Sequence, residues 1–179
     1  RYGKKVFEKK YGKTHYSFEN DGAHFIVLDD ANNKFDQEQL DWFEKDLRDA
    51  NKKYTFVLFH SPPFDPSGKP DADGAGHGLP DTESEKIMSV LLRHKSKITL
   101  LVCGHVHGYW QGEYQGIPLV ISGGAGAPLR KSGDDAAGNY RASYHYIIID
   151  IMRDKAILRL RNPETEGVDT ETVPLSGGR

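Results

Sequence analysis

The stretch Ile98-Thr-Leu-Leu-Val-Cys-Gly-His-Val-His107 gives the clearest indication of the fold. Its first six residues are apolar or β-branched without polar alternation, a pattern that is typical of a strand buried on both faces of an α/β sheet. A second run of the same kind, Tyr54–Phe59, ends directly at His60. The two runs therefore predict strands of one buried sheet, each followed by histidine.

Helix and strand signals alternate around these two strands. An N-cap at Asp36 and an apolar stripe predict a helix over 36–50, and the capping box Thr82-x-x-Glu85 predicts a second helix over 82–94. Residues 61–81 are rich in proline and glycine, which predicts a long loop of the kind that is usually functional or disordered. The other expected elements are a basic helix at 4–10 and strands at 16–18, 23–29, 109–114, 117–122, 144–151 and 155–161.

Length and composition limit the classes of protein to consider. The chain has 179 residues, of which 24 are basic and 26 acidic, so its net charge of −2 provides no basic surface for nucleic acid. Cys103 is the single cysteine, which excludes an internal disulfide, and no run reaches the roughly 18 apolar residues of a membrane span. We expect one domain over 1–179, with an acidic tail or edge strand at 162–179. The composition indicates no cellular compartment.

Histidines follow both buried strands at the expected carboxyl edge of the sheet, where open α/β sheets bind their ligands. His105 and His107 are two residues apart, so on an extended backbone their side chains point the same way. Two such imidazoles can each reach one of two metal ions spaced roughly 3.5 to 4 Å apart. The alternative is that these histidines are neutral residues of the core, but this does not explain why all three follow the ends of buried strands. We therefore predict a metal site at His60, His105 and His107.

Other polar and aromatic residues carry weaker expectations. His77, in the long loop, is a candidate contact for a substrate phosphate, although a solvated histidine is the simpler interpretation. Asp29 and Asp30 more simply bind loop amides than a metal. Tyr109 and Trp110 either line a pocket or belong to the core. The remaining histidines are expected on the surface or in strands: His15, His24, His94 and His145.

Several motifs resemble the second half of a calcineurin-like metallophosphoesterase, over residues from about 11 to 151. They are His60-Ser-Pro-Pro-Phe64, Gly104-His-Val-His107, Ile121-Ser-Gly-Gly-Ala-Gly126 and the preceding segments 25–29 and 39–43. The resemblance implies an α/β fold, namely the C-terminal portion of a four-layer α/β/β/α sandwich with mixed sheets. The loop patterns are most similar to the bacterial branch that includes cyclic-nucleotide phosphodiesterases.

This resemblance implies that the parent protein is a two-metal hydrolase of phosphoric esters. His60 and His105 would bind one metal ion and His107 the other, and Mn²⁺, Fe or Zn²⁺ suits imidazoles better than Mg²⁺ or Ca²⁺. A phosphodiesterase is one interpretation, and a protein or nucleotide monophosphatase on the same scaffold is another. A non-catalytic module, which holds structural zinc or only packs its histidines, is the alternative from a different class. Three histidines without a fourth ligand argue against a closed zinc site.

The sequence also departs from the family pattern. The family's first half carries Asp-x-His, Gly-Asp-x-x-Asp and Gly-Asn-His, and none of these occurs here; Gly133-Asp134-Asp135 and Gly138-Asn139-Tyr140 only approximate two of them. We therefore expect a partial domain whose N-terminal half is absent or is a separate partner chain. By itself the chain should be catalytically silent, with no certain catalytic residue, and should hold at most one ion weakly. Its apolar strand faces should be exposed and favour self-association.

Overall fold

A computed structural model describes residues 2–69, 76–163 and 169–177. Its helices are α1 (Tyr2–Tyr11), α2 (Gln37–Asp49) and α3 (Asp81–Arg93), with a short 3-10 helix, η1 (Lys95–Lys97). Its strands are β1 (Tyr16–Asn20), β2 (Ala23–Val27), β3 (Tyr54–Leu58), β4 (Leu100–Cys103), β5 (Tyr109–Tyr114), β6 (Ile117–Ser122), β7 (Tyr146–Ile151), β8 (Ala156–Arg161) and β9 (Asp169–Leu175). The alternation of helix and strand follows the pattern that the sequence predicts.

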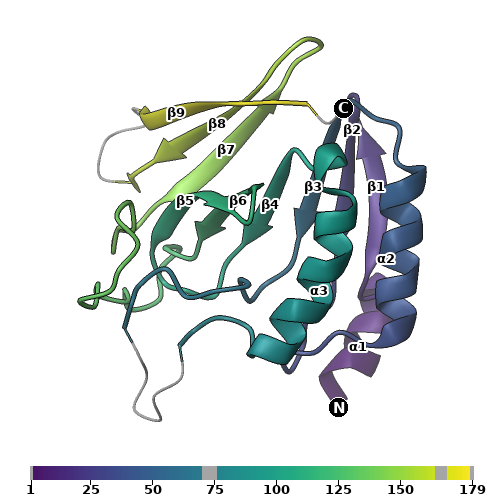
Figure 1. The fold of residues 1–179 in the computed structure, drawn as a ribbon, viewed down its shortest axis with the longest axis horizontal. Helices are drawn as coiled ribbons and strands as arrows, with labels where there is room; N and C mark the ends of the chain where they lie inside the picture. The colour runs from purple at the N-terminus through teal and green to yellow at the C-terminus, as the bar shows by residue number, and fades with distance from the viewer. Residues whose placement is uncertain (1, 70–75, 164–168, 178–179) are drawn as a thin grey trace.

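The larger sheet has six strands in the order β1-β2-β3-β4-β6-β5 (Figure 1). Its central strands β2, β3, β4 and β6 run parallel, whereas the edge strands β1 and β5 are antiparallel to their neighbours. Because β3 and β4 are adjacent, the prediction that the two apolar runs belong to one sheet is confirmed. The parallel arrangement brings their carboxyl ends to the same edge of the sheet.

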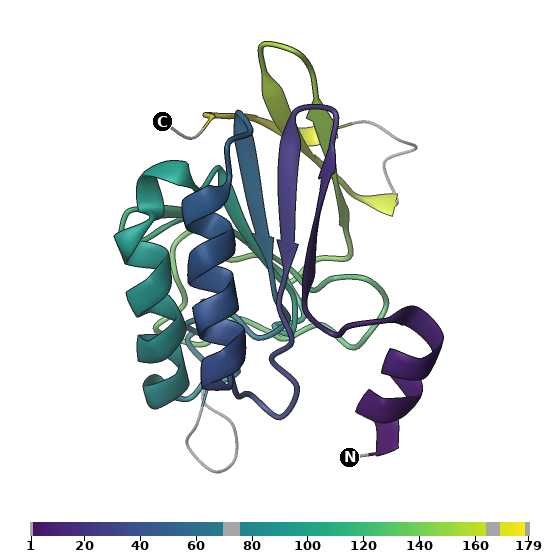
Figure 2. The ribbon, with the colours of Figure 1, turned by 90° about the vertical axis from the view of Figure 1, so that its right-hand side faces the viewer.

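Helices α2 and α3 cover one face of this sheet (Figure 2). α2 begins after Asp36, whose carboxylate accepts a hydrogen bond from the Gln39 amide at 2.8 Å, so the predicted N-cap is confirmed. The stripe predicted from the sequence consists of Leu40, Phe43, Leu47 and Ala50. The first three are buried against the sheet, and Ala50 is the C-cap. The apolar spacing therefore decides which side of the helix faces the core.

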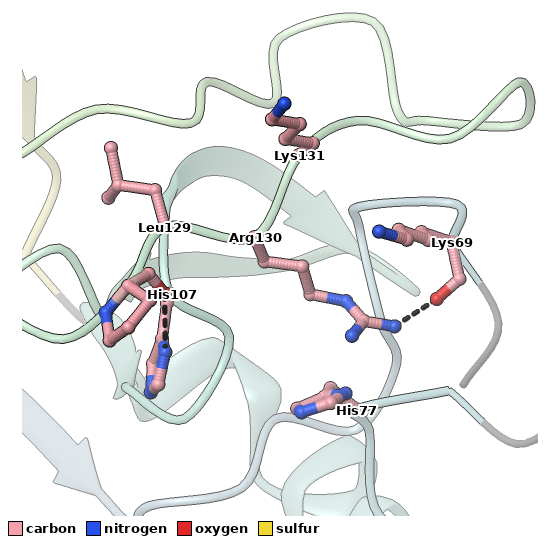
Figure 3. Close-up of a pocket in the computed structure, with 7 residues that line it drawn as sticks. Lys69, His77, His107, Leu129, Arg130 and Lys131 are labelled. Atoms are coloured by element: carbon pink, nitrogen blue, oxygen red, sulfur yellow. Dashed lines mark hydrogen bonds between the residues drawn. The ribbon is translucent and has the colours of Figure 1, made fainter. Parts of the chain in front are cut away.

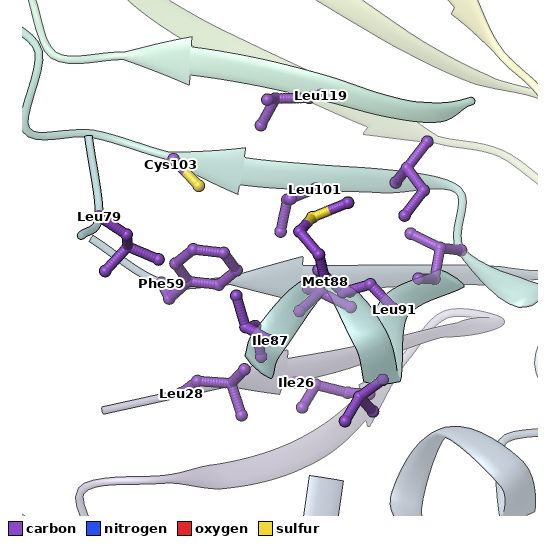
Figure 4. Close-up of a cluster of buried hydrophobic side chains, with 14 of the residues drawn as sticks. Ile26, Leu28, Phe59, Leu79, Ile87, Met88, Leu91, Leu101, Cys103 and Leu119 are labelled. Carbon is purple, nitrogen blue, oxygen red and sulfur yellow. The ribbon is translucent and has the colours of Figure 1, made fainter. Parts of the chain in front are cut away.

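The core between the helices and the sheet is continuous. Figure 4 shows Ile87 and Leu91 of α3 close to Ile26 of β2 and Leu101 of β4, all of them essentially unexposed. Burial of an aliphatic side chain of this size contributes about 1.5–3 kcal/mol. This packing fixes the strand ends from which the candidate site is built.

The start of α3 differs from the sequence prediction. The helix begins at Asp81, and its N-cap, Pro80, makes no side-chain capping bond. The prediction of a capping box at Thr82 is therefore wrong. Pro80, with φ −53°, leads the chain into the helix one residue earlier. Ser84, in the first turn, instead donates to the Pro63 carbonyl at 2.8 Å and ties α3 to the loop after β3.

A second sheet from the same chain covers the other face of the central sheet. β7, β8 and β9 form it in that order, with antiparallel pairing. Alternate residues of β8, namely Ala156, Leu158 and Leu160, are buried against Phe56 and Leu100, each only 1% exposed. The expectation that the apolar strands expose a face is therefore wrong, because β7–β9 supply the cover.

An aromatic row remains open at the β1 edge. Phe18 stacks on Phe25, which stacks on Phe56, with ring centroids 4.9 and 5.1 Å apart. Phe18 and its neighbour Tyr16 are 47% and 43% exposed. Helix α1 stands apart from the sandwich beside this edge (Figure 2). Self-association through the edge stays a prediction.

The described residues thus form helix, sheet and sheet layers, the mixed α/β sandwich that the sequence predicts. Within these residues, no helix is both long enough and apolar enough to span a membrane.

Candidate metal centre

Two histidine side chains meet at the carboxyl edge of the central sheet. His60 follows β3 and His105 follows β4, and Nε2 of His60 lies 3.0 Å from Nδ1 of His105. Their ring centroids are 4.9 Å apart. The backbones are joined as well, since the Gly104 amide donates to the His60 carbonyl at 2.9 Å. The sheet therefore brings these two predicted residues together, while their role as metal ligands stays a prediction.

The backbone at His105 is strained. Its φ of +61° lies in the left-handed region, which costs a residue with a Cβ roughly 1–2 kcal/mol. The expectation that His105 and His107 share an extended backbone is therefore wrong. The end of β4 at Cys103 agrees with the predicted apolar run. Strain of this kind persists where the surrounding structure enforces it, and it concentrates at functional sites.

His107 is held by the segment 128–130. Its Nδ1 lies 2.9 Å from the Pro128 carbonyl, which can only accept, so this bond selects the tautomer that carries its proton on Nδ1 and has the lone pair on Nε2. The Arg130 amide also donates to the His107 carbonyl at 2.8 Å. A carbonyl that fixes the ring tautomer in this way is the usual support of a metal-binding histidine.

The electrostatic surroundings keep His105 neutral. Burial lowers the pKa of His105, and the charges of His60, His77 and His107 lower it further, against the opposing effect of Asp30. A pKa lowered from the usual histidine value of about 6.5 favours the uncharged ring at neutral pH. The neutral ring is the form in which imidazole binds a metal ion.

Asp30 supports the loop that begins at His60. Its buried carboxylate accepts hydrogen bonds from the amides of His60 and Ser61 at 3.1 and 2.6 Å. Asp29 accepts from the Ala31 amide at 3.0 Å. The expectation that both carboxylates bind loop amides is confirmed, and Asp30 acts as a positioning residue for His60.

The paired imidazoles suit a single ion. Two nitrogen ligands of a tetrahedral zinc ion lie about 3.3 Å apart when each Zn–N distance is about 2.0–2.1 Å. The separation of 3.0 Å between His60 and His105 is close to this value. The described part of the chain contains no group of three His, Cys, Asp or Glu side chains arranged around one point, so a complete coordination shell needs further donors.

The loops beyond the histidines are joined by an ion pair that no pattern in the sequence predicts. Asp65 Oδ2 lies 3.1 Å from the Arg130 guanidinium, and both side chains are about nine-tenths buried. Asp65 also accepts from the His77 amide at 2.9 Å. Burial raises the pKa of Asp65, but hydrogen bonds from His77 and Ser67 and the charge of Arg130 outweigh it and hold that pKa below its usual value.

His77 lies next to the histidine pair. Its ring centroid is 5.2 Å from that of His105, so the loop packs it against the candidate site. The simpler interpretation of His77 as a solvated loop residue therefore does not describe its position. Its contact with substrate stays a prediction.

Several other residues prove structural. Tyr109 and Trp110 belong to the core. His145 is 3% exposed and precedes β7, so the expectation of a surface or strand position is wrong; its Nε2 lies 3.0 Å from the Ser122 hydroxyl. Tyr140, in one of the two approximate family motifs, donates to the Arg130 carbonyl at 2.6 Å and supports the same loop.

Comparison with known proteins gives a family and a set of similar folds. A model of the calcineurin-like phosphoesterase family matches residues 3–109. The purple acid phosphatase PPD1 from yellow lupin (Lupinus luteus) seeds has a similar structure, with a TM-score of 0.74, 18% sequence identity and coverage of 92% of this chain and 33% of that one. GAP50, the anchor in the inner membrane complex of Plasmodium, gives a TM-score of 0.69 at 13% identity, covering 92% of this chain and 54% of that one. The chain thus spans about a third of the first protein and about half of the second, and similarity at these identities shows the fold alone.

Proposed function

Because this chain belongs to the calcineurin-like phosphoesterase family, we propose that it supplies histidine ligands to the metal centre of a phosphoric ester hydrolase. The observation that carries the proposal is the contact between His60 and His105 at the carboxyl ends of adjacent parallel strands. Bound divalent ions would stabilise charge on the phosphoryl oxygens and lower the pKa of a water nucleophile.

The residues of this chain would bind and orient. His60 and His105 would hold one ion, and His107, whose tautomer is set by the Pro128 carbonyl, would hold the other. Asp30 would keep His60 in place through the loop amides. Imidazole donors favour Mn²⁺, Fe or Zn²⁺ in such a centre.

The remaining ligands would come from outside this set of histidines. The sequence contains none of the Asp-x-His, Gly-Asp-x-x-Asp and Gly-Asn-His motifs. A carboxylate bridge between two ions and a residue beside the leaving group would therefore be supplied by a further segment or chain of the parent protein. On this proposal the 179-residue chain alone binds at most one ion weakly and turns over no ester.

The test is hydrolysis of a chromogenic phosphate diester and a monoester with Mn²⁺. The chain is assayed alone and together with the segment that carries the missing motifs, fused or in trans. We expect hydrolysis only in the combined protein and a loss of about 100-fold or more in kcat/KM for His105→Ala and His107→Ala. His94→Ala, at the C-terminal end of α3, is the matched control and should retain activity.

Each outcome separates the alternatives. Preference for the diester favours a phosphodiesterase, and preference for the monoester favours a monophosphatase. Metal binding by the combined protein without hydrolysis of either ester would support a non-catalytic module. Metal-dependent turnover by the chain alone would refute the division of ligands between two segments.

A further inference from the structure

A cationic pocket of about 460 Å³ adjoins His107 (Figure 3). It is lined by Lys69 and His77 from the loop after β3, by His107, and by the segment Pro128–Lys131. Among the described residues, this lining contains three cationic side chains, two imidazoles and no carboxylate. Its volume lies within the range of about 300–1,000 Å³ that is usual for small-molecule sites.

One wall of the pocket is fixed to the candidate metal ligand. The Pro128 carbonyl accepts from the His107 ring, and the Arg130 amide donates to the His107 carbonyl. Lys131 follows directly in the chain. The position of this wall relative to the His107 imidazole is therefore set by two hydrogen bonds.

The opposite wall is fixed through Arg130. Its guanidinium crosses the pocket toward Lys69, where it donates to the Lys69 carbonyl, and it also donates to the Ser67 hydroxyl at 2.8 Å (Figure 3). Backbone bonds join the same two loops, from the Gly133 amide to the Ser67 carbonyl at 2.8 Å and from the Ala137 amide to the Pro66 carbonyl at 2.9 Å. The pocket is thus built before any ligand enters it.

Among the described residues, the lining of this pocket carries more positive than negative charge. Asp65 matches the charge of Arg130. Within the part of the chain that the structure describes, neither Lys69 nor Lys131 pairs its ammonium group with a carboxylate. Like charges gathered around one concave surface raise the local concentration of anions and favour their binding.

We propose that the cationic pocket binds a second phosphoryl group of the substrate. The favoured substrates would be phosphoric esters that carry another phosphate, as in a diphosphate or a bisphosphate. The inference rests on the proposed function, since the reacting phosphoryl group would lie at the histidines and the second beside His107. Lys69 and Lys131 would contact the second group from opposite walls.

The first experiment needs no metal and no turnover. Pyrophosphate and inorganic phosphate are titrated by calorimetry into the chain in buffer that contains EDTA. We expect pyrophosphate to bind more tightly than phosphate, and Lys69→Gln and Lys131→Gln each to weaken it by about three- to tenfold. Lys131→Arg should retain binding. Lys45→Gln, the matched loss of one charge at an exposed position of α2, should leave binding unchanged. Wild-type affinity for pyrophosphate in both lysine variants, or equal affinity for the two anions, would refute the proposal that the cationic pocket binds a second phosphoryl group.

The second experiment uses the metal-loaded, combined protein. We expect kcat/KM to be higher for a bisphosphate ester than for the matched monophosphate, and this ratio to fall by about tenfold in Lys69→Gln/Lys131→Gln. If both esters are hydrolysed and the substitutions leave the ratio of their kcat/KM values unchanged, the proposed role of the cationic pocket is wrong while the proposed function stands. If no ester is hydrolysed, the proposed function is wrong, and the metal-free titration still decides whether the pocket binds phosphoryl groups.

Discussion

Between the helices and the central sheet, side chains such as Phe43 of α2 and Leu101 of β4 are at most 1% exposed, whereas partly exposed histidines follow the carboxyl ends of the same strands. The core side chains have apolar neighbours, and the helix that carries Phe43 begins at an ordinary N-cap, Asp36. The edge has His105 in the left-handed region, and the described residues beside His107 carry an excess of positive charge. The difference indicates that the core stabilises the fold, while the edge carries local strain that, on the proposed function, serves ligand binding.

The largest effect should come from the core. Phe43→Ala removes a fully buried ring and should lower the free energy of unfolding by about 3–5 kcal/mol. Phe7→Ala on α1, where the ring is 41% exposed, should cost less than about 1 kcal/mol. Urea denaturation of both variants measures the contrast, and equal losses would contradict it.

The next effect tests the junction of the two loops. Gly68 has φ +61°, and a Cβ there would overlap the backbone of Asp135 and Ala136. Gly68→Ala should lower the free energy of unfolding by about 2–4 kcal/mol, because strain and overlap act together.

Gly126→Ala is the matched control for this junction. Gly126 has φ +105° with nothing within 4 Å of the added Cβ, so the substitution should cost only about 1 kcal/mol of conformational strain. Thermal unfolding compares the two variants. A loss at Gly68 no greater than at Gly126 would show that the loops are not held in close contact.

At the histidine edge a substitution should stabilise the fold. His105→Gly relieves the left-handed strain and should raise the free energy of unfolding by up to about 1 kcal/mol, after the entropic cost of glycine. His107→Gly, which removes the bond to Pro128, should lower it instead. Chemical denaturation in the absence of metal gives both values, and destabilisation by His105→Gly would contradict the assignment of strain.

The smallest effect is a dependence on pH. Burial lowers the pKa of both His105 and His145 in the folded chain. As the pH falls below the usual histidine pKa of about 6.5, the unfolded chain binds protons that the folded chain does not, so the free energy of unfolding decreases. The decrease should stop growing once the pH lies below both folded pKa values.

Unfolding in urea at several pH values between 7.5 and 5, with EDTA present, measures this dependence. Asp65 does not affect this measurement. Burial raises its pKa, but hydrogen bonds and the charge of Arg130 outweigh burial and lower it, so its contribution to the free energy of unfolding is lost only below about pH 4. The slope should decrease in His105→Gln/His145→Gln. An unchanged slope in that variant would contradict the prediction.

The candidate site could be predicted only in part. The sequence predicts His60, His105 and His107 because they follow apolar runs at strand ends, a signal that lies within a few residues. Asp65 and Arg130 gave no such signal, since each is one charged residue in a long loop. Their pairing depends on two loops that meet only after the strands are in place.

By itself the sequence determined the two buried strands, the helix that Asp36 caps, the mixed α/β class and the family motifs. These features depend on periodicity and capping, which act over one or two turns of the chain. Only the tertiary structure decided that β7–β9 cover the second face of the sheet, that His105 turns left-handed toward His60, and that Lys69 and Lys131 line one pocket. Each of these depends on contacts between residues far apart in the chain, and local preferences do not encode such contacts.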